Sequence, residues 1–472
     1  MRSHKPSTVV RLFLAILMTL MLTVASAAST RGSTRPAAQA NATGNSGDGS
    51  IWYLAEGSTA WGFICIIAIE NPNPHEVTLR ITFMTDSGPV TLEDIVLPAE
   101  SQGYFDPESD LGEMDFSTKV ECLEGDIIAV DRTMLWIGDI GDETTGALEG
   151  HSSIGVTSPD TTWFLPEGSS AWGFECWLLI QNPNDTEATC NVTYMVEGVG
   201  PYTVTKKVPA NSRRTYNMAD DIGNHDASIK VDSNIPVIPE RAMYRNNRRE
   251  GHDSIGTTSP ANDYYLAEGT TAYGFTTYVL VQNPNPTPAN VQLVYMTPGG
   301  PVYPPAFSMP ANSRKTVRVN DFLPNTDLST QVHADQPIIA ERAMYWDSGT
   351  GEACHDSIGL DSPHKKFYLP EGETSGGTEV ETWTLVQNPN NDYVEVQVSY
   401  LPNVLDRGQK HSFTDILPPN SRKTYNMADT IREGAAGIMV ESLTTGKKVM
   451  AERSMYWYGK EGGTNTIGGY SD

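Results

Sequence analysis

The chain has 472 residues, a formal net charge of −26 at pH 7 and a pI of about 4.7. Such an acidic chain repels nucleic acid and anionic membranes, so neither is an expected partner. A soluble, acidic extracellular surface is enough to explain this charge.

The first residues carry the pattern of a secretory signal peptide. Basic side chains precede an apolar stretch from Leu12 to Val24, which ends in small residues. That stretch is about 13 residues long, short of the roughly 20 needed to cross a bilayer, so an uncleaved anchor is the weaker alternative. We expect residues 1–27 to be cleaved, residues 28–50 to form a flexible linker, and the mature protein to be secreted or at the cell surface, with no membrane span.

Four copies of one pattern fill the rest of the chain. Each copy opens with an aromatic residue, Leu, Ala or Pro, Glu and Gly, continues with Asn-Pro-Asn, and ends with an acid, Arg, any residue and Met, followed by Ile-Gly. The copies recur at intervals of about 100 residues, which predicts four domains. We call them modules 1 to 4, at residues 51–159, 160–260, 261–363 and 364–472.

Each module is expected to be an immunoglobulin-like β-sandwich. Between the landmarks the hydrophobic pattern has period two, as from Val77 to Phe83, and the segments are bounded by Pro, Asn or Gly. About seven or eight short strands per module suit a sandwich, whereas the blades of a propeller, the competing architecture, are only about 40 to 50 residues long. Ser-Pro steps at three module junctions predict stiff joints, and hence an all-β, semi-rigid string of four modules.

The combined motifs resemble a repeat domain of unknown function found in secreted and surface proteins of actinobacteria and neighbouring bacteria. They are Tyr-Leu-Ala-Glu-Gly, Asn-Pro-Asn, Glu-Arg-x-Met-Tyr-Trp and His-Asp-Ser-Ile-Gly, and they cover residues 51–472. The resemblance implies an exported bacterial β-sandwich array. It implies no reaction.

Two segments look like compressed catalytic triads, at His252 to Ser254 and at His355 to Ser357. Consecutive residues of a strand point to alternate faces, so they cannot form a Ser-His-Asp relay. The pattern is also lost in modules 1 and 4. We therefore expect no catalytic residue here, and read these side chains as strand-end hydrogen-bonding groups.

The opening glutamate of each module is expected to meet the late arginine of the same module in a partly buried, bidentate ion pair. Solvated charges are the alternative, and paired glycosidase carboxylates a remote one. The expected pairs are Glu56 with Arg132, Glu167 with Arg241, Glu268 with Arg342, and Glu371 with Arg453.

Three aromatic residues occupy one repeat position, in a loop of small residues: Trp61, Trp172 and Tyr273. Module 4 has Ser375, Gly376, Gly377 and Thr378 there instead. These aromatic side chains either cover the end of a sandwich or offer a flat surface on which a sugar ring stacks. If the protein binds glycan, modules 1 to 3 are expected to bind and module 4 is not.

The cysteines suggest one or two disulfides. Cys176 and Cys190 flank the Asn-Pro-Asn turn symmetrically, so a hairpin closing there predicts a bridge between them. A second bridge between Cys65 and Cys122 is a weaker expectation, and Cys354 is left free or intermolecular. No metal-binding spacing is present, and we expect neither metal nor cofactor.

From the sequence we expect a secreted, non-enzymatic structural or adhesion protein of the cell surface or extracellular space. The alternative is a protein that binds glycan or cell wall through its loop aromatics, and a secreted hydrolase is the remote third. The expected partners are cell-wall or extracellular polysaccharide, or surface proteins.

Overall fold

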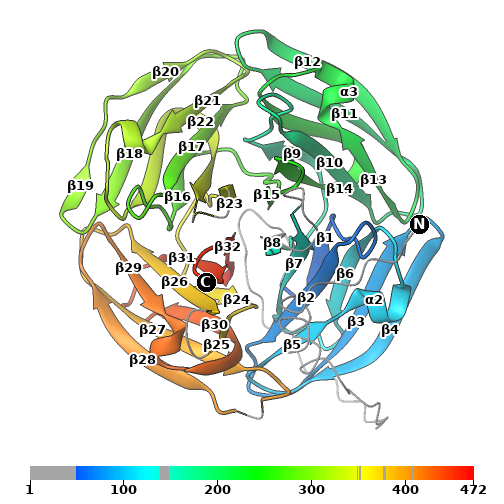
Figure 1. The fold of residues 1–472 in the computed structure, drawn as a ribbon, viewed down its shortest axis with the longest axis vertical. Coiled ribbons are helices and arrows are strands. Elements are labelled where there is room, and N and C mark those ends of the chain that lie inside the picture. The colour runs from blue at the N-terminus through cyan, green and yellow to red at the C-terminus, as the bar shows by residue number, and fades with distance from the viewer. Residues whose placement is uncertain (1–48, 139–147, 348, 350–351, 376–378, 407) are drawn as a thin grey trace.

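Figure 1 shows the computed structural model, which describes residues 49–138, 148–347, 349, 352–375, 379–406 and 408–472. The expected signal peptide and most of the linker lie outside the described residues. The described chain is almost entirely antiparallel β-structure with four very short helices, which confirms the expected all-β class. None of its helices is long and apolar enough to cross a membrane.

Module 1 consists of two four-stranded antiparallel sheets, with strand orders β1-β6-β3-β4 and β5-β2-β7-β8. Its elements are β1 (Ile51–Leu54), β2 (Ile64–Asn71), β3 (Val77–Thr85), β4 (Gly88–Leu97), β5 (Ser101–Phe105), α2 (Pro107–Leu111), β6 (Phe116–Cys122), β7 (Ala129–Ile137) and β8 (Leu148–Ile154).

Modules 2 and 3 repeat this plan, except that one 19-residue strand takes part in both sheets. Module 2 contains β9 (Asp160–Leu165), β10 (Glu175–Asn182), β11 (Ala188–Val196), β12 (Gly200–Val208), β13 (Ser212–Asn217), α3 (Met218–Ile222), β14 (Ala227–Arg245) and β15 (Glu250–Ile255). Module 3 contains β16 (Ala261–Leu266), β17 (Thr276–Asn283), β18 (Ala289–Thr297), β19 (Gly300–Val302), β20 (Phe307–Met309), β21 (Ser313–Arg318), η1 (Val319–Asp321), β22 (Ser329–Asp347) and β23 (Glu352–Ile358).

Module 4 closes the chain and adds a short final strand, β33, which pairs with β24. Its elements are β24 (Lys366–Leu369), β25 (Glu373–Ser375), β26 (Val380–Asn388), β27 (Val394–Pro402), β28 (His411–Leu417), β29 (Ser421–Asn426), η2 (Met427–Asp429), β30 (Glu433–Ser442), β31 (Met450–Trp457), β32 (Gly462–Ile467) and β33 (Gly469–Ser471).

The alternating pattern explains why the strands form and how they pack. In β3 the side chains of Val77, Leu79, Ile81 and Phe83 are buried, whereas the residues between them are partly exposed. One face of the strand therefore enters the core between the two sheets, as expected for a half-buried strand.

The Asn-Pro-Asn turns connect the two sheets of a module and do not close a hairpin. The Asn182 side chain donates to the carbonyls of Thr186, Val208 and Pro209, which fixes this crossover. Strand β10 then pairs with β13 and β14, while β11 pairs with β12 and β14.

The expected disulfide between Cys176 and Cys190 is wrong for this reason. Cys176 on β10 pairs with Met243 and Cys190 on β11 pairs with Ser233, at two separate parts of the long strand β14, and both are buried free thiols. Cys65 and Cys122 are likewise unbridged. Cys354 is also a free thiol, but it is buried on β23 rather than lying in a loop.

The modules close into a ring around a common axis, with β8, β15, β23 and β32 nearest the centre (Figure 1). Module 4 contacts module 1 directly: the Asn403 side chain donates to Gln102 Oε1 at 2.8 Å, and Arg453 lies 3.2 Å from Asp131. The expected semi-rigid string of modules is therefore wrong. Contacts between modules, which no single copy of the repeat reveals, bend the chain back on itself.

Candidate functional site

The three predicted aromatic residues stand out from the ring on identical turns. Trp61, Trp172 and Tyr273 are 78%, 78% and 77% exposed, and each has a positive φ, of 60°, 58° and 57°. The glycine that follows each of them also has a positive φ, and a backbone hydrogen bond closes each turn, as from the Phe63 amide to the Ala60 carbonyl at 3.0 Å. Two successive positive φ values are the pattern of a type I′ turn.

An aromatic residue is an unfavourable choice at this position. The first residue of such a turn is usually Asn, Asp or Gly, because other side chains are strained at positive φ, typically by about 1 kcal/mol or more. The exposed ring gains almost nothing from burial in return. Three copies nevertheless keep an aromatic residue there, which suggests that the ring serves something outside the folded chain.

Each turn is held rigidly from below. In module 1, the Ser58 hydroxyl accepts from the Ala60 amide at 3.2 Å, and Thr59 Oγ1 donates to the Gly112 carbonyl at 2.6 Å. Phe63, the last residue of the turn, packs on Trp136 and on Tyr244 of module 2. The turn therefore lies at the interface between two modules, and the exposed aromatic side chain has a fixed base.

All three turns lie on the same face of the ring. Ile64 follows the first turn and pairs with Leu135, near the end of β7 where β8 begins. The other end of β8 is Ile154, which lines an axial cup together with its three counterparts from modules 2 to 4. Because the four modules meet at that cup, their turns are at the opposite end of the axis. The three aromatic turns therefore lie at the same end of the axis.

Module 4 lacks the aromatic turn. Glu373 to Ser375 form β25, which pairs with β30 at the corresponding place. Gly376, Gly377 and Thr378 lie outside the described residues. Module 4 thus presents no equivalent of Trp61 among the residues that the structure describes.

The ring is held together inside by four buried arginines. Each lies near the opening glutamate of its own module, as the sequence predicts, with shortest N···O distances of 3.2, 3.2, 3.7 and 3.1 Å in modules 1 to 4. The arginine side chains are at most 1% exposed, so these pairs are fully rather than partly buried. They are also not isolated, because each arginine reaches into the following module.

Arg132 shows this arrangement. Its Nη1 donates to Glu240 at 2.8 Å and its Nη2 to Asp253 at 2.7 Å, both in module 2. Glu240 also accepts from the backbone amide of Glu56 at 2.7 Å. Arg241 repeats the pattern with Glu341 and Asp356, Arg342 with Glu452 and Asn465, and Arg453 with Asp131 alone. The second carboxylate of each cluster was missed from the sequence because it comes from a different copy.

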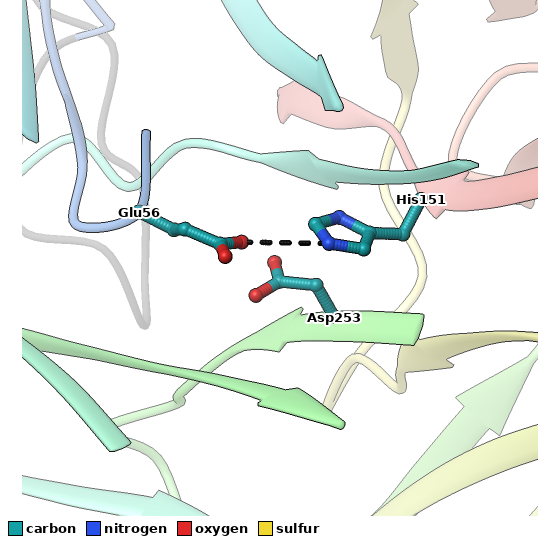
Figure 2. Close-up of side chains that lie close together, drawn as sticks. All are labelled: Glu56, His151 and Asp253. Carbon is teal, nitrogen blue, oxygen red and sulfur yellow. Dashed lines mark ion pairs between the residues drawn. The ribbon is translucent and has the colours of Figure 1, made fainter. Parts of the chain in front are cut away.

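Figure 2 shows Glu56, His151 and Asp253, whose ligand atoms lie within 4.8 Å of one another. Glu167, His252 and Asp356 form the same group one module further on. These residue types suit a divalent cation. The guanidinium of Arg132, however, already lies 2.7 Å from Asp253 and 3.2 Å from Glu56. A cation thus occupies the centre of the group, which favours a structural role.

The pKa values of the histidine and the aspartate shift in opposite directions in the two clusters. Burial raises the pKa of Asp253 well above its ordinary value, and burial with Arg132 lowers that of His151. In the second group burial opposes the charged forms, but Asp356 and Glu167 still raise the pKa of His252, and His252 with Arg241 lowers that of Asp356. The first cluster therefore holds a neutral histidine, and the second a charged pair.

No family model and no curated protein matches the chain. Several solved structures are similar to parts of it, and two examples follow. A crystal structure of Thermotoga maritima 1070 is 11% identical, with a TM-score of 0.21, and the match covers 22% of this chain and 96% of that chain. The Anabaena sensory rhodopsin transducer is 23% identical, with a TM-score of 0.16, and the match covers 18% of this chain and 95% of that chain.

The His-Asp-Ser segments serve the ring rather than forming a nucleophile relay. On β15, His252 contacts Asp356 and Tyr345 of module 3, at 2.8 and 3.1 Å, while Asp253 contacts Arg132 of module 1. Adjacent side chains thus point to different neighbouring modules, as the alternation along a strand requires.

The closing Ile-Gly motifs line the axial cup, which the sequence analysis did not foresee. The four isoleucines are Ile154, Ile255, Ile358 and Ile467, and they line a hollow that opens to solvent. The glycines are needed for packing, since a Cβ on Gly256 would lie 3.2 Å from the Trp163 ring. Identical motif ends in all four copies were the signal that these segments converge.

Proposed function

We propose that this protein is a secreted, non-enzymatic adhesion protein of the bacterial surface, which binds a repetitive extracellular or cell-wall polysaccharide. Its four modules are sandwiches of the immunoglobulin-like type, closed into a ring. Trp61, Trp172 and Tyr273 are the binding residues, and no cofactor is required.

The observation that carries this proposal is the left-handed backbone of three highly exposed aromatic residues on one face. Sugar rings stack on such flat apolar surfaces, and each contact contributes roughly as much as other aromatic pairs, about 0.5–1.5 kcal/mol. One contact of that size gives only weak binding. A rigid ring that presents three such contacts to one polymer gains affinity through effective concentration, by about 10²-fold or more.

A polymer fits this arrangement better than a single small sugar. The three turns belong to different modules, so only a ligand with repeated units can reach more than one of them. Two of the turns also have a basic side chain beside them, which can form a polar contact with the polysaccharide. Arg248 lies over the Phe63 ring of the first turn, and Lys460 lies 5.7 Å from the centre of the Tyr273 ring of the third.

The test is co-sedimentation with insoluble purified cell-wall polysaccharide. The variant carries Trp61→Asn, Trp172→Asn and Tyr273→Asn, because asparagine suits the positive φ and keeps the turns intact. We expect retention to fall at least tenfold while the melting temperature does not decrease.

The matched control removes two exposed aromatic side chains elsewhere, Tyr303 and Tyr393, which are 62% and 65% exposed. A Tyr303→Ala, Tyr393→Ala protein is expected to bind like the parent. Equal retention of the folded triple variant would overturn the binding role of the turns and leave a purely structural role for the ring.

A further inference from the structure

Each module inserts a buried polar side chain into the module before it. In three of the four interfaces this side chain is a glutamine: Gln181, Gln282 and Gln387 are fully buried. Their Nε2 atoms donate across the interface to backbone carbonyls of the preceding module, at 3.2, 3.2 and 3.4 Å. The acceptors are Thr118, Ile229 and Thr330.

The fourth interface, where module 4 meets module 1, carries Glu70 at this position. We call it the closing interface. Glu70 is also fully buried, and neither of its carboxyl oxygens forms a hydrogen bond of ordinary geometry among the described residues, although the backbone amides of Leu369 and Ile438 face the carboxyl group. A carboxylate cannot donate to a backbone carbonyl as the three glutamines do, whereas a protonated carboxyl group can.

A second change accompanies Glu70. The residue facing it in module 4 is Gly437, where the preceding modules have Ser117, Ser228 and Ser329. A Cβ on Gly437 would lie only 3.0 Å from Cγ and Oε2 of Glu70. The glycine therefore makes room for this carboxyl group, so the two substitutions fit one another.

The groups around Glu70 do not neutralise a charge on it. Asp131 on β7 is acidic and is bound to Arg453, and β24 contributes the phenol of Tyr368. The ammonium of Lys410, just before β28, is held by Glu100 at 2.7 Å. The neighbouring strand β5 contributes Gln102, which carries no charge. Burial, and then Asp131, raise the pKa of Glu70 well above its ordinary value, against the opposing effects of the Leu369 and Ile438 amides and of Lys410.

The closing interface also lacks other contacts. The buried arginines Arg213, Arg314 and Arg422, which donate to carbonyls of the preceding module, are replaced at this interface by Gln102. Ser152 stands where the first cluster has Asp253. Among the four interfaces, it is the one that joins no consecutive modules of the chain.

We propose that the closing interface is a proton-dependent latch, in which the neutral carboxyl group of Glu70 keeps the ring closed and its ionisation releases module 4 from module 1. The proton passes to solvent as the interface opens. The three aromatic turns are packed at the other interfaces, so opening here leaves their local support intact.

The direction follows from linkage. Glu70 holds its proton more tightly in the closed ring than in the open one, so closure is most stable at low pH and weakens as the pH rises above the ordinary carboxyl value. Glu70 contributes one proton, so through Glu70 the equilibrium between closed and open forms shifts by up to tenfold per pH unit until the pKa of its closed form is reached. Burial also raises the pKa of Asp131 at this interface to about 8, and that carboxyl group is present in both the parent and Glu70→Gln.

Hydrogen exchange of the Val404 amide tests the latch. This amide donates across the closing interface to the Gln102 carbonyl at 2.9 Å. The parent is compared with Glu70→Gln at the same pH, from 5 to 9, so that the intrinsic exchange rate cancels. We expect the ratio of parent to variant rates to rise by up to tenfold per pH unit. A ratio that does not change with pH would overturn the proposal.

A second variant introduces a buried carboxyl group at another interface. Gln181→Glu places the same carboxyl group between modules 1 and 2, where the Glu56 amide donates to Glu240 and reports on that contact. Exchange rates of the Glu56 amide are again compared with those of Glu70→Gln at the same pH. We expect this ratio to change with pH in the Gln181→Glu variant and to stay constant in the parent. Equal pH dependence at both interfaces of the parent would show general loosening and contradict a latch.

Discussion

Arg453 on β31 of the last module lies 3.2 Å from Asp131 on β7 of the first, in the same geometry that joins each arginine to the module that follows it. The pair joins residues from opposite ends of the repeat array. Together with Asn403 and Gln102, it closes four sandwiches into one ring. The modules therefore share their buried charges, and the stability of each depends on its neighbours.

Arg241 tests this network, because it is bound to three acidic groups, Glu167, Glu341 and Asp356. Arg241→Met removes the guanidinium from three buried acidic groups, of which Asp356 keeps a charged partner, His252, and the free energy of unfolding should fall by about 3–5 kcal/mol. Urea unfolding measures this change. The control Lys207→Met removes an exposed ion pair with Glu187 and should cost less than about 1 kcal/mol. Similar midpoints for the two variants would argue against the network.

All five thiols should be free in protein that has never been reduced. Cys65 and Cys176 are fully buried, which raises their pKa values to about 12, so they should react slowly even at pH 9. A colorimetric thiol assay should detect five groups in denaturant and very few in the native protein. Finding two thiols fewer in denaturant would restore the disulfide between Cys176 and Cys190.

The error over this disulfide shows what the sequence could not supply. Cys176 and Cys190 are placed symmetrically about Pro183, which describes a hairpin equally well as a crossover between sheets. The strand pairing distinguishes them, as do the hydrogen bonds of the Asn182 side chain to the carbonyls of Thr186, within the turn, and Val208, at the end of β12. Strands and module boundaries follow from local periodicity, but the pairing of strands depends on contacts far apart in the chain.

The exposed turn aromatics and the ion pairs could be located from the sequence for a related reason. Trp61 and its counterparts share one repeat position, and Glu56 and Arg132 are the charged landmarks of one copy. Comparison between copies therefore found both. Arg132 also binds Glu240 and Asp253, and one copy contains no information on where the next copy packs. Ring closure was missed for the same reason.

Replacing a turn aromatic should separate stability from binding. Trp61→Asn relieves the strain at a φ of 60° and should raise the free energy of unfolding by up to about 1 kcal/mol, while polysaccharide binding falls. Trp61→Val should destabilise the protein instead, because a β-branched residue tolerates positive φ worst. Thermal unfolding of both variants checks the order. A less stable asparagine variant would mean that the indole contributes packing.

His151 and His252 should give stability opposite dependences on pH. The pKa of His151 is lowered in the folded protein, so its contribution is lost as the pH falls below about 6.5, when the unfolded chain takes up the proton. The pKa of His252 is raised, so its contribution is present below about 6.5 and is lost as the pH rises through the folded value. Within each range the slope approaches about 1.4 kcal/mol per pH unit.

The measurement is urea unfolding of His151→Gln and His252→Gln against the parent from pH 5 to 8. Relative to the parent, the first variant should gain stability towards pH 5, and the second towards pH 8. Parallel curves for the two variants would show that the histidines have the same charge state in both clusters.

Because closure rests on contacts between modules, the ring should tolerate a new starting point. Gly49 and Asp472 both line the axial cup, so the two ends of the described chain lie at one end of the ring. A flexible linker of about six glycines and serines reaches roughly 13 Å on average, and lengthening it adds little entropy cost. A permuted chain that joins these ends and starts at Pro159 moves the unlinked interface to modules 1 and 2. It should fold at pH 5, with a melting temperature within about 5 °C of the parent. Circular dichroism and size-exclusion chromatography check this outcome. An expanded or aggregated permutant would show that the Ser158–Pro159 connection, rather than the buried arginine contacts, holds modules 1 and 2 together.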